Sequence, residues 1–201
     1  RNDSIKYTSS KTIQFSTIIG IYSCCLFLFF GQKFGWLTFK NIEVGQYLII
    51  LAWLCPIMYV EGTLVSILNG LGETFDTFKH SLMSACIKIS FIFFAIPIFG
   101  IKAYLWGLLA GHLFSCLIHF RSIKKITKLD LDVITFLVKP ILAAIFSASI
   151  VKFLYIQMIP LIGESLGLLL VSSIVMFGIY LIALVLLKAV TRGDLKRIKN
   201  M

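Results

Sequence analysis

Two ionisable side chains stand inside apolar segments of this chain, where a charge is costly. Lys88 lies in the middle of ACIKISFIFFAIP, residues 85–97, and Glu61 lies in LCPIMYVEG, residues 54–62. A charge at the centre of a membrane helix costs about 2.5–3.5 kcal/mol on insertion scales, so such residues usually face a water-filled cavity or a partner. A short loop joins the two segments, so the sequence predicts a Glu61–Lys88 pair, direct or through water. That pair either lines a transport pathway or only locks two helices together, and both interpretations stay open.

A second polar pattern lies in AYLWGLLAGHLFSCLIHF, residues 103–120. His112, Ser115 and His119 follow at i, i+3 and i+7, which places them on one face of a helix. The two histidines are too far apart along that helix to share one metal ion, and no cysteine or acid joins them. We expect His119 to lie at a membrane interface. His112 either lines a cavity, where it can carry protons, or is simply hydrogen-bonded within a helical bundle.

The sequence contains none of the residue sets that membrane enzymes need. It has no HExxH or GxSxG motif, no pair of intramembrane aspartates and no DxD-like acidic cluster in a cytoplasmic loop. Asp130 and Asp132 come closest, but they lie among lysines. The five cysteines all fall inside apolar runs and are expected to be small buried side chains. We therefore expect no enzyme, no metal site and no cofactor.

Composition places these residues in a membrane. The chain of 201 residues is 59% hydrophobic and only 14% charged, whereas soluble domains carry about 25% charged residues. The net charge of +10 comes from lysines and arginines between the apolar runs, so membrane topology explains it better than a nucleic-acid partner. Because the chain begins with Arg1 and shows no cleavable signal peptide, we expect it to be the C-terminal part of a longer protein.

Apolar runs long enough to cross a bilayer predict an all-α helical bundle, since a span needs about 20 apolar residues. The six predicted spans are approximately residues 13–30, 46–68, 78–99, 103–120, 136–155 and 166–187. The basic residues of the loops lie mainly on one side: Arg1, Lys6, Lys11, Lys79, Arg121, Lys124, Lys125, Lys128, Lys188, Arg192, Lys196, Arg197 and Lys199. The intervening loops hold only Lys33, Lys40 and Lys102. This imbalance predicts that both termini of the chain are cytoplasmic.

Proline and glycine are predicted to bend or pack these helices. Pro56 removes a backbone donor in the second span and predicts a kink there, with Gly62 close by. In the fourth span, Gly107 and Gly111 form a GxxxG pattern, which favours close helix contact. Two further glycines, Gly70 and Gly72, are predicted to form a tight cytoplasmic turn, in which Gly72 can adopt a positive φ.

Several segments in order resemble one transporter family. The stretch ILNGLGETFDTFKHSLMSACIKISFIFFAIPIFGIKAYLWGLLAG, residues 67–111, combines a GLG turn, a central lysine in the next span and a glycine-spaced span after it. The tail TRGDLKRI, residues 191–198, adds to the pattern. The chain is similar to the C-terminal half of polysaccharide transporters in the multidrug/oligosaccharidyl-lipid/polysaccharide exporter superfamily, and most similar to the stage V sporulation protein B group.

The resemblance implies a function and an architecture. Such proteins have fourteen helices in two lobes around a central cavity and work by alternating access, so the six spans would be the last six. The implied activity is a flippase that moves a lipid-linked oligosaccharide, polysaccharide or peptidoglycan precursor across the bacterial plasma membrane, with membrane lipids as further partners. Lys88 matches the family pattern, whereas Glu61 is supported by the residues alone. We expect Lys88 to make the cleft positive and Glu61 to temper that charge or to couple it to protons.

Other functions stay open on the sequence. A multidrug antiporter of the same superfamily, coupled to H⁺ or Na⁺, would make Glu61 the central residue. A scaffold subunit of cell-wall or spore-envelope synthesis would translocate nothing itself. A membrane transferase is disfavoured, because the acidic cluster that it needs is missing.

Overall fold

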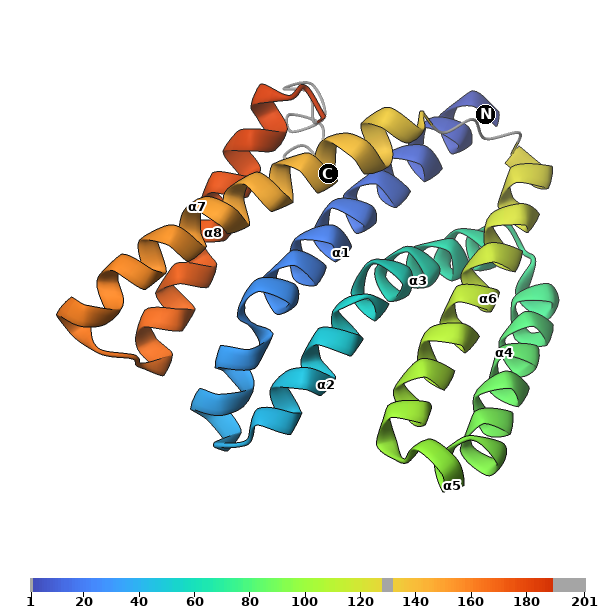
Figure 1. The fold of residues 1–201 in the computed structure, drawn as a ribbon. Coiled ribbons are helices and arrows are strands. Elements are labelled where there is room, and N and C mark those ends of the chain that lie inside the picture. Colours follow the sequence, from blue (N-terminus) through green and yellow to red (C-terminus); the bar gives the residue numbers. More distant parts are fainter. Residues whose placement is uncertain (1, 128–131, 190–201) are drawn as a thin grey trace. The chain divides into compact units, whose positions relative to one another are not determined.

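The described part of the chain is helical and contains no strand. The computed structural model describes residues 2–127 and 132–189 (Figure 1). The elements are α1 (Asn2–Phe39), α2 (Ile42–Ala52), α3 (Leu54–Gly70), α4 (Thr74–Phe94), α5 (Ile96–Phe99), α6 (Ile101–Thr127), the π-helix η1 (Ile134–Val138), α7 (Lys139–Ile162) and α8 (Leu166–Leu186). The predicted all-α class is confirmed. Arg1, Lys128, Asp130 and the TRGDLKRI tail lie outside the described residues.

Several of these helices are suited to a membrane. Within residues 2–127 and 132–189, four helices are long and apolar enough to cross one: Ile5–Phe39, Ile101–Thr127, Ile134–Ile162 and Leu166–Leu186. The bent pair Ile42–Ala52 and Leu54–Gly70 raises the number to five if it is one span. Helix α4, which carries Lys79, His80 and Lys88, is not among them. The chain is therefore a multi-pass membrane protein.

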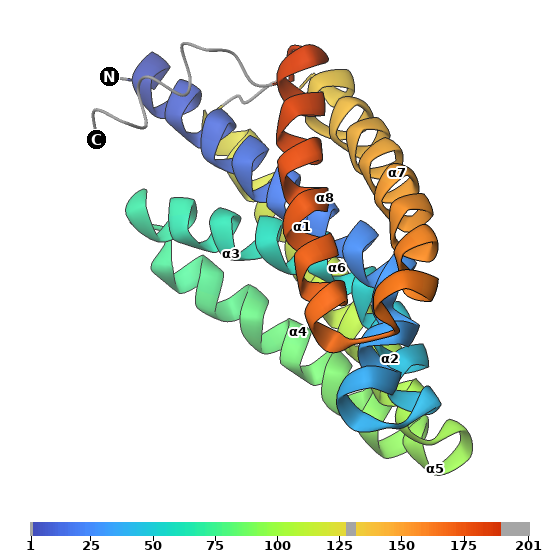
Figure 2. The same cartoon turned by 90° about the vertical axis from the view of Figure 1, so that its left-hand side faces the viewer.

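The chain divides into two compact units, and each is described by itself. Among the described residues, the first unit contains 2–24 and 49–127, and the second contains 25–48 and 132–189. In the first unit, α6 packs along both α3 and α4, and the short helix α5 joins α4 to α6 (Figures 1 and 2). In the second unit, α7 and α8 form an antiparallel hairpin.

The bend between α2 and α3 lies beside Pro56, where the sequence predicts a kink. The two helices meet at Trp53 at an angle of 44°. Proline lacks the N–H that would bond to the carbonyl four residues earlier, and here that carbonyl belongs to Ala52, the last residue of α2. Gly20 of α1 approaches closely at this point, since a Cβ on Gly20 would lie 2.6 Å from the Cα of Pro56.

The first helix is much longer than its predicted span. The sequence places a loop after residue 30, but α1 continues to Phe39. Glycines explain the difference, because a Cβ on Gly35 would lie 2.6 Å from the Cα of Gly45 in α2. The glycines here allow two helix backbones to touch and do not break the helix. The helix ends at Lys40, which has a φ of 54°.

A tight connection joins α7 to α8 in the second unit. Gly163 ends α7 with a φ of 82°, and the Ser165 side chain accepts a hydrogen bond from the Leu168 N–H at 3.2 Å, which caps α8. Glu164 of this connection pairs with Lys33 of α1. These bonds account for the sharp reversal between two long apolar helices.

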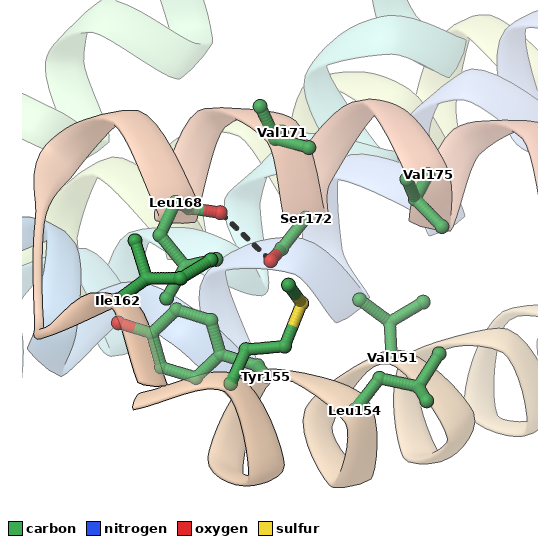
Figure 3. A pocket seen from close by; sticks show the side chains of 9 residues that line it. Val151, Leu154, Tyr155, Ile162, Leu168, Val171, Ser172 and Val175 are labelled. Carbon is green, nitrogen blue, oxygen red and sulfur yellow. Dashed lines mark hydrogen bonds between the residues drawn. The ribbon is translucent and has the colours of Figure 1, made fainter. Parts of the chain in front are cut away.

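A pocket of about 330 Å³ lies between α7 and α8 and is almost entirely apolar (Figure 3). Its lining consists of Val151, Leu154, Tyr155, Met158, Ile162, Leu168, Val171, Ser172 and Val175. The Ser172 hydroxyl donates to the Leu168 carbonyl of its own helix at 2.8 Å. The lining therefore contains no charged side chain.

Candidate functional site

Three ionisable side chains from three helices of the first unit meet in one chain of hydrogen bonds. Nζ of Lys88 on α4 lies 3.1 Å from Nε2 of His112 on α6. On the other side of the ring, Nδ1 of His112 lies 2.5 Å from Oε2 of Glu61 on α3. We call these three residues the Lys88 cluster. The residues that the sequence picks out separately are thus brought together, with His112 between the lysine and the glutamate.

The helix packing explains why His112 is the central member. The turn between α3 and α4 makes these helices neighbours in sequence, but α6 packs along both of them. His112 projects from α6 and reaches a side chain on each partner helix. The predicted Glu61–Lys88 pair is therefore bridged through an imidazole.

Small residues of α6 make room for the lysine. A Cβ on Gly111 would lie 2.6 Å from both Cγ and Cε of Lys88, so the lysine stem crosses α6 where there is no side chain. The buried Ser84 hydroxyl of α4 donates to the Gly111 carbonyl at 2.8 Å and fixes the two helices at this level. One turn away, a Cβ on Gly107 would lie 2.5 Å from Cβ of Phe91. The GxxxG pattern thus faces α4 and shapes the Lys88 cluster.

The partners of each atom define the protonation states that satisfy the cluster. A lysine ammonium only donates, and a carboxylate only accepts. Nε2 of His112 must therefore accept from Lys88, while Nδ1–H donates to Glu61. The ring is then neutral, and the cluster carries one positive and one negative charge. The side chains of His112 and Glu61 are 18% and 14% exposed, so the charges are shielded from solvent without being sealed from it.

The polar face of α6 continues beyond the cluster. Ser115 lies beside Glu61, and its hydroxyl oxygen is 3.3 Å from Nδ1 of His119. The His119 side chain is fully buried, at 0% exposed, although the sequence predicts an interfacial position. Its ring centroid lies 5.3 Å from that of His80 on α4. We call Ser115, His119 and His80 the histidine row.

The remaining predicted residues have different surroundings. Gly62 lies within α3, and a Cβ there would meet nothing within 4 Å, so no packing contact explains it. Gly72 has the positive φ expected for the α3–α4 turn, at 91°. Gly70 is the last residue of α3 and also has open space beside it. These two residues shape the turn and lie apart from the Lys88 cluster.

His80 is the site residue that sequence reasoning missed. It belongs to the polar first half of α4, which the sequence predicts to be the end of a loop. No sequence pattern relates His80 to His119. Only the pairing of α4 with α6 brings the two imidazoles together. Within residues 2–127 and 132–189, no group of three or more His, Cys, Asp or Glu side chains is arranged to hold a metal ion.

Comparison with known proteins adds no identification. No protein-family model, curated protein or solved structure matches this chain. The arrangement of the Lys88 cluster therefore has to be interpreted from its chemistry. An ammonium group held beside an imidazole and a carboxylate can attract an anion, and the imidazole–carboxylate pair can gain or lose a proton.

Proposed function

We propose that this chain is the C-terminal part of a membrane transporter that flips an anionic lipid-linked saccharide across the bacterial plasma membrane. The cargo class is a lipid-linked oligosaccharide, polysaccharide or peptidoglycan precursor. In this proposal α4 and α5 form a further span, which gives six in all, and both termini are cytoplasmic. The six spans are the last six of a fourteen-helix protein that works by alternating access, as the resemblance to the polysaccharide exporters implies.

The observation that carries the proposal is the Lys88 cluster. A scaffold helix has little reason to keep an ammonium group, an imidazole and a carboxylate inside an apolar unit, where replacing buried ionic groups by apolar ones is often neutral or stabilising. A lipid-linked phosphate or diphosphate needs a cationic, hydrated route through hydrocarbon, and a lysine can provide the attraction. In the observed arrangement Lys88 is held by a neutral imidazole and not by the carboxylate directly, so an anion can compete for it.

The test is a flipping assay on the full-length protein in vesicles. A fluorescent prenyl-diphosphate sugar is placed in both leaflets, and dithionite reports the fraction in the outer leaflet over time. Lys88→Met should lower the rate by about ten-fold or more, since a lost charged hydrogen bond is worth about 1.5–3 kcal/mol. The matched control is Lys102→Met, which removes an exposed lysine next to α5. Undiminished flipping by correctly folded Lys88→Met would remove Lys88 from the pathway.

A second candidate is an antiporter coupled to H⁺ or Na⁺, which the short Glu61–His112 contact favours. In that case the carboxylate is the coupling group, and Glu61→Gln should abolish ion movement while the protein remains folded. A scaffold would show neither lipid flipping nor ion movement in vesicles. The same preparation therefore separates the three functions.

A further inference from the structure

The histidine row extends the Lys88 cluster toward the α3–α4 turn. His80 lies in the second turn of α4, and Lys88 lies eight residues further along the same helix, about 12 Å at 1.5 Å per residue. We propose that the row is a proton pathway that charges the Glu61–His112 pair, and that this proton is taken up together with an anion bound at Lys88. The inference rests on the proposed transport function and names its coupling ion.

The contacts of the row allow one consistent direction of proton donation, with the proton of His119 on Nδ1. A serine hydroxyl has a single proton, so if Ser115 donates to Glu61, its oxygen accepts from Nδ1–H of His119. Nε2 of His119 is then unprotonated at rest and can take up a proton. Each donor along this row is thus aimed at Glu61, which is the order needed to deliver a proton to that carboxylate.

The two nitrogens at the start of the row are buried without a well-aligned partner. Nε2 of His119 and Nδ1 of His80 make no hydrogen bond of normal geometry among the described residues. The Thr77 backbone carbonyl is a further acceptor beside the His119 ring. An unsatisfied buried polar atom costs about 1–3 kcal/mol. The two rings are tilted by 59° with centroids 5.3 Å apart, and a proton or a water molecule between them would satisfy both atoms.

Comparison of Ser84 with Ser115 shows which kind of hydrogen-bond partner a proton pathway needs. Ser84 of α4 bonds to α6 and is buried like Ser115, but it donates to a backbone carbonyl. A backbone carbonyl accepts a hydrogen bond but does not take up the proton and pass it on. An imidazole can take up a proton at one ring nitrogen and release a proton from the other. Ser84 therefore holds the helices together, and Ser115 connects titratable groups.

One proton changes the charge of the cluster. At rest, Lys88 is positive, Glu61 negative and His112 neutral, so the net charge is zero. A proton that enters from solution at His80 and passes through His119 and Ser115 is shared by the Glu61–His112 pair, and the net charge becomes +1. If the proton resides on His112, Nε2–H faces the Lys88 ammonium and their hydrogen bond is lost. In either position the proton makes the cluster a better anion site.

Linkage makes the effect reciprocal: an anion that binds more tightly to the protonated cluster must promote protonation. The titratable groups that face His112 and Glu61 are Lys88 on α4 and, on α6, Cys116 and His119, with His80 behind His119. Helix α5 has no titratable side chain in its sequence IPIF. An imidazole can accept a proton at one ring nitrogen and release one from the other, so the histidines of this set are the groups able to relay a proton.

The experiment follows protons and lipid in the same vesicles. The full-length protein is reconstituted in phosphatidylethanolamine–phosphatidylglycerol vesicles that contain pyranine, with the fluorescent prenyl-diphosphate sugar as cargo and an imposed pH gradient. His119→Gln and Ser115→Ala should lower proton movement and gradient-driven flipping together, by about ten-fold or more, because loss of a proton-transfer group typically costs 10²–10⁴-fold. Exchange of the lipid without a gradient should persist. Ser90→Ala, which removes an exposed hydroxyl of α4 that bonds within its own helix, is the control and should change neither rate by more than about two-fold.

A spectroscopic measurement covers the case in which a variant does not fold. With ¹⁵N-labelled histidine in the unmodified protein, the ring-nitrogen signals should show the proton on Nδ1 in both His112 and His119. His80→Gln, at the half-buried entry of the row, should lower proton movement without disturbing the buried helix contact. A proton on Nε2 in place of Nδ1 in either ring of the resting protein would overturn the pathway.

The outcomes separate the two proposals. Lipid flipping without any proton movement, or full gradient-driven flipping by folded His119→Gln, overturns the proton pathway and leaves the flippase standing. Proton movement without lipid flipping overturns the flippase and supports the row as a pathway for another cargo. If neither protons nor lipid move, both proposals fail.

Discussion

The imidazole of His112 keeps the charges of Lys88 and Glu61 apart within one chain of hydrogen bonds. One ring nitrogen lies 3.1 Å from the lysine Nζ and the other lies 2.5 Å from the glutamate Oε2. A direct lysine–glutamate pair would neutralise itself and leave little attraction for a third group. With a neutral ring between them, each charge retains part of its field. This separation has consequences for stability, packing and solvent access that can each be measured.

The first prediction concerns the coupling between Glu61 and His112. Glu61→Gln and His112→Gln should each destabilise the protein, because each leaves a partly buried group without its partner. In the double variant the penalty should be smaller than the sum, with a coupling energy of about 0.5–3 kcal/mol. Denaturant unfolding in detergent micelles measures the four members of the cycle. Strict additivity would mean that the contact contributes nothing.

The second prediction concerns the glycine under the lysine stem. In Gly111→Ala the new Cβ would lie 2.6 Å from two carbons of Lys88, so the stem has to move away from His112. We expect a loss of about 1–3 kcal/mol in unfolding free energy, as for other overpacked sites. Combining it with Lys88→Ala should recover much of this loss, because the clashing stem is then absent. Persistence of the full loss in the double variant would contradict the packing described for α4 and α6.

The third prediction is that Gly62→Ala, in the same unit, does not lower the unfolding free energy. Nothing lies within 4 Å of a Cβ at this position in α3, and alanine is preferred to glycine inside a helix by up to about 1 kcal/mol. The variant should therefore be as stable as the unmodified protein or more stable in the same unfolding measurement. A clear loss would show that Gly62 bends the helix during function or folding.

The sequence correctly predicts the ends of a helix where local capping residues determine them. The last predicted span, residues 166–187, agrees with α8 to within a residue, because Ser165 caps it and Gly163 ends the helix before it. The prediction fails at residues 31–39, where glycine and lysine indicate a loop. There, tertiary contact between Gly35 and Gly45 keeps the chain helical, and no local pattern reveals that contact.

The candidate site, too, could be predicted from the sequence only in part. Burial of a charge in an apolar run is visible in the sequence, and it identifies Lys88 and Glu61. The role of His112 depends on α6 lying against both α3 and α4, so the sequence leaves it open between a cavity residue and a structural one. The contact between His80 and His119 depends on the register of α4 against α6. Periodicity within one helix contains no information on that register.

The fourth prediction concerns Asp132, which lies before η1 and outside the membrane spans. The Thr135 hydroxyl donates to its carboxylate at 2.7 Å and holds the pKa of Asp132 below its ordinary value, with help from the Ile134 N–H. Any stability that this carboxylate contributes is present above its unfolded pKa and is lost as the pH falls through the lower folded value. Thr135→Val should raise the pKa, measured by ¹³C NMR of the side-chain carboxyl. An unchanged midpoint would exclude the hydrogen bond.

The fifth prediction concerns the ion pair between Lys33 and Glu164 in the second unit. Their side chains are 45% and 30% exposed, so water screens the attraction. Glu164→Gln should change the unfolding free energy by no more than about 1 kcal/mol, as expected for an exposed pair. High salt should not alter the difference between variant and unmodified protein by more than that amount. A larger effect would mean that this pair is shielded from solvent in the membrane.

The last prediction tests whether the Lys88 position faces water. Charged methanethiosulfonate reagents react with thiolates, which form only where water is present. In a background where the five native cysteines are replaced, Lys88→Cys should react, and an anion that binds the cluster should slow the reaction. Phe94→Cys, on an exposed side chain of the same helix, is the control. If Phe94 faces acyl chains, its cysteine should resist the reagent even though it is more exposed than position 88. The reverse order of reactivity would place position 88 against lipid, and an ammonium group there could not attract a headgroup from an aqueous cleft.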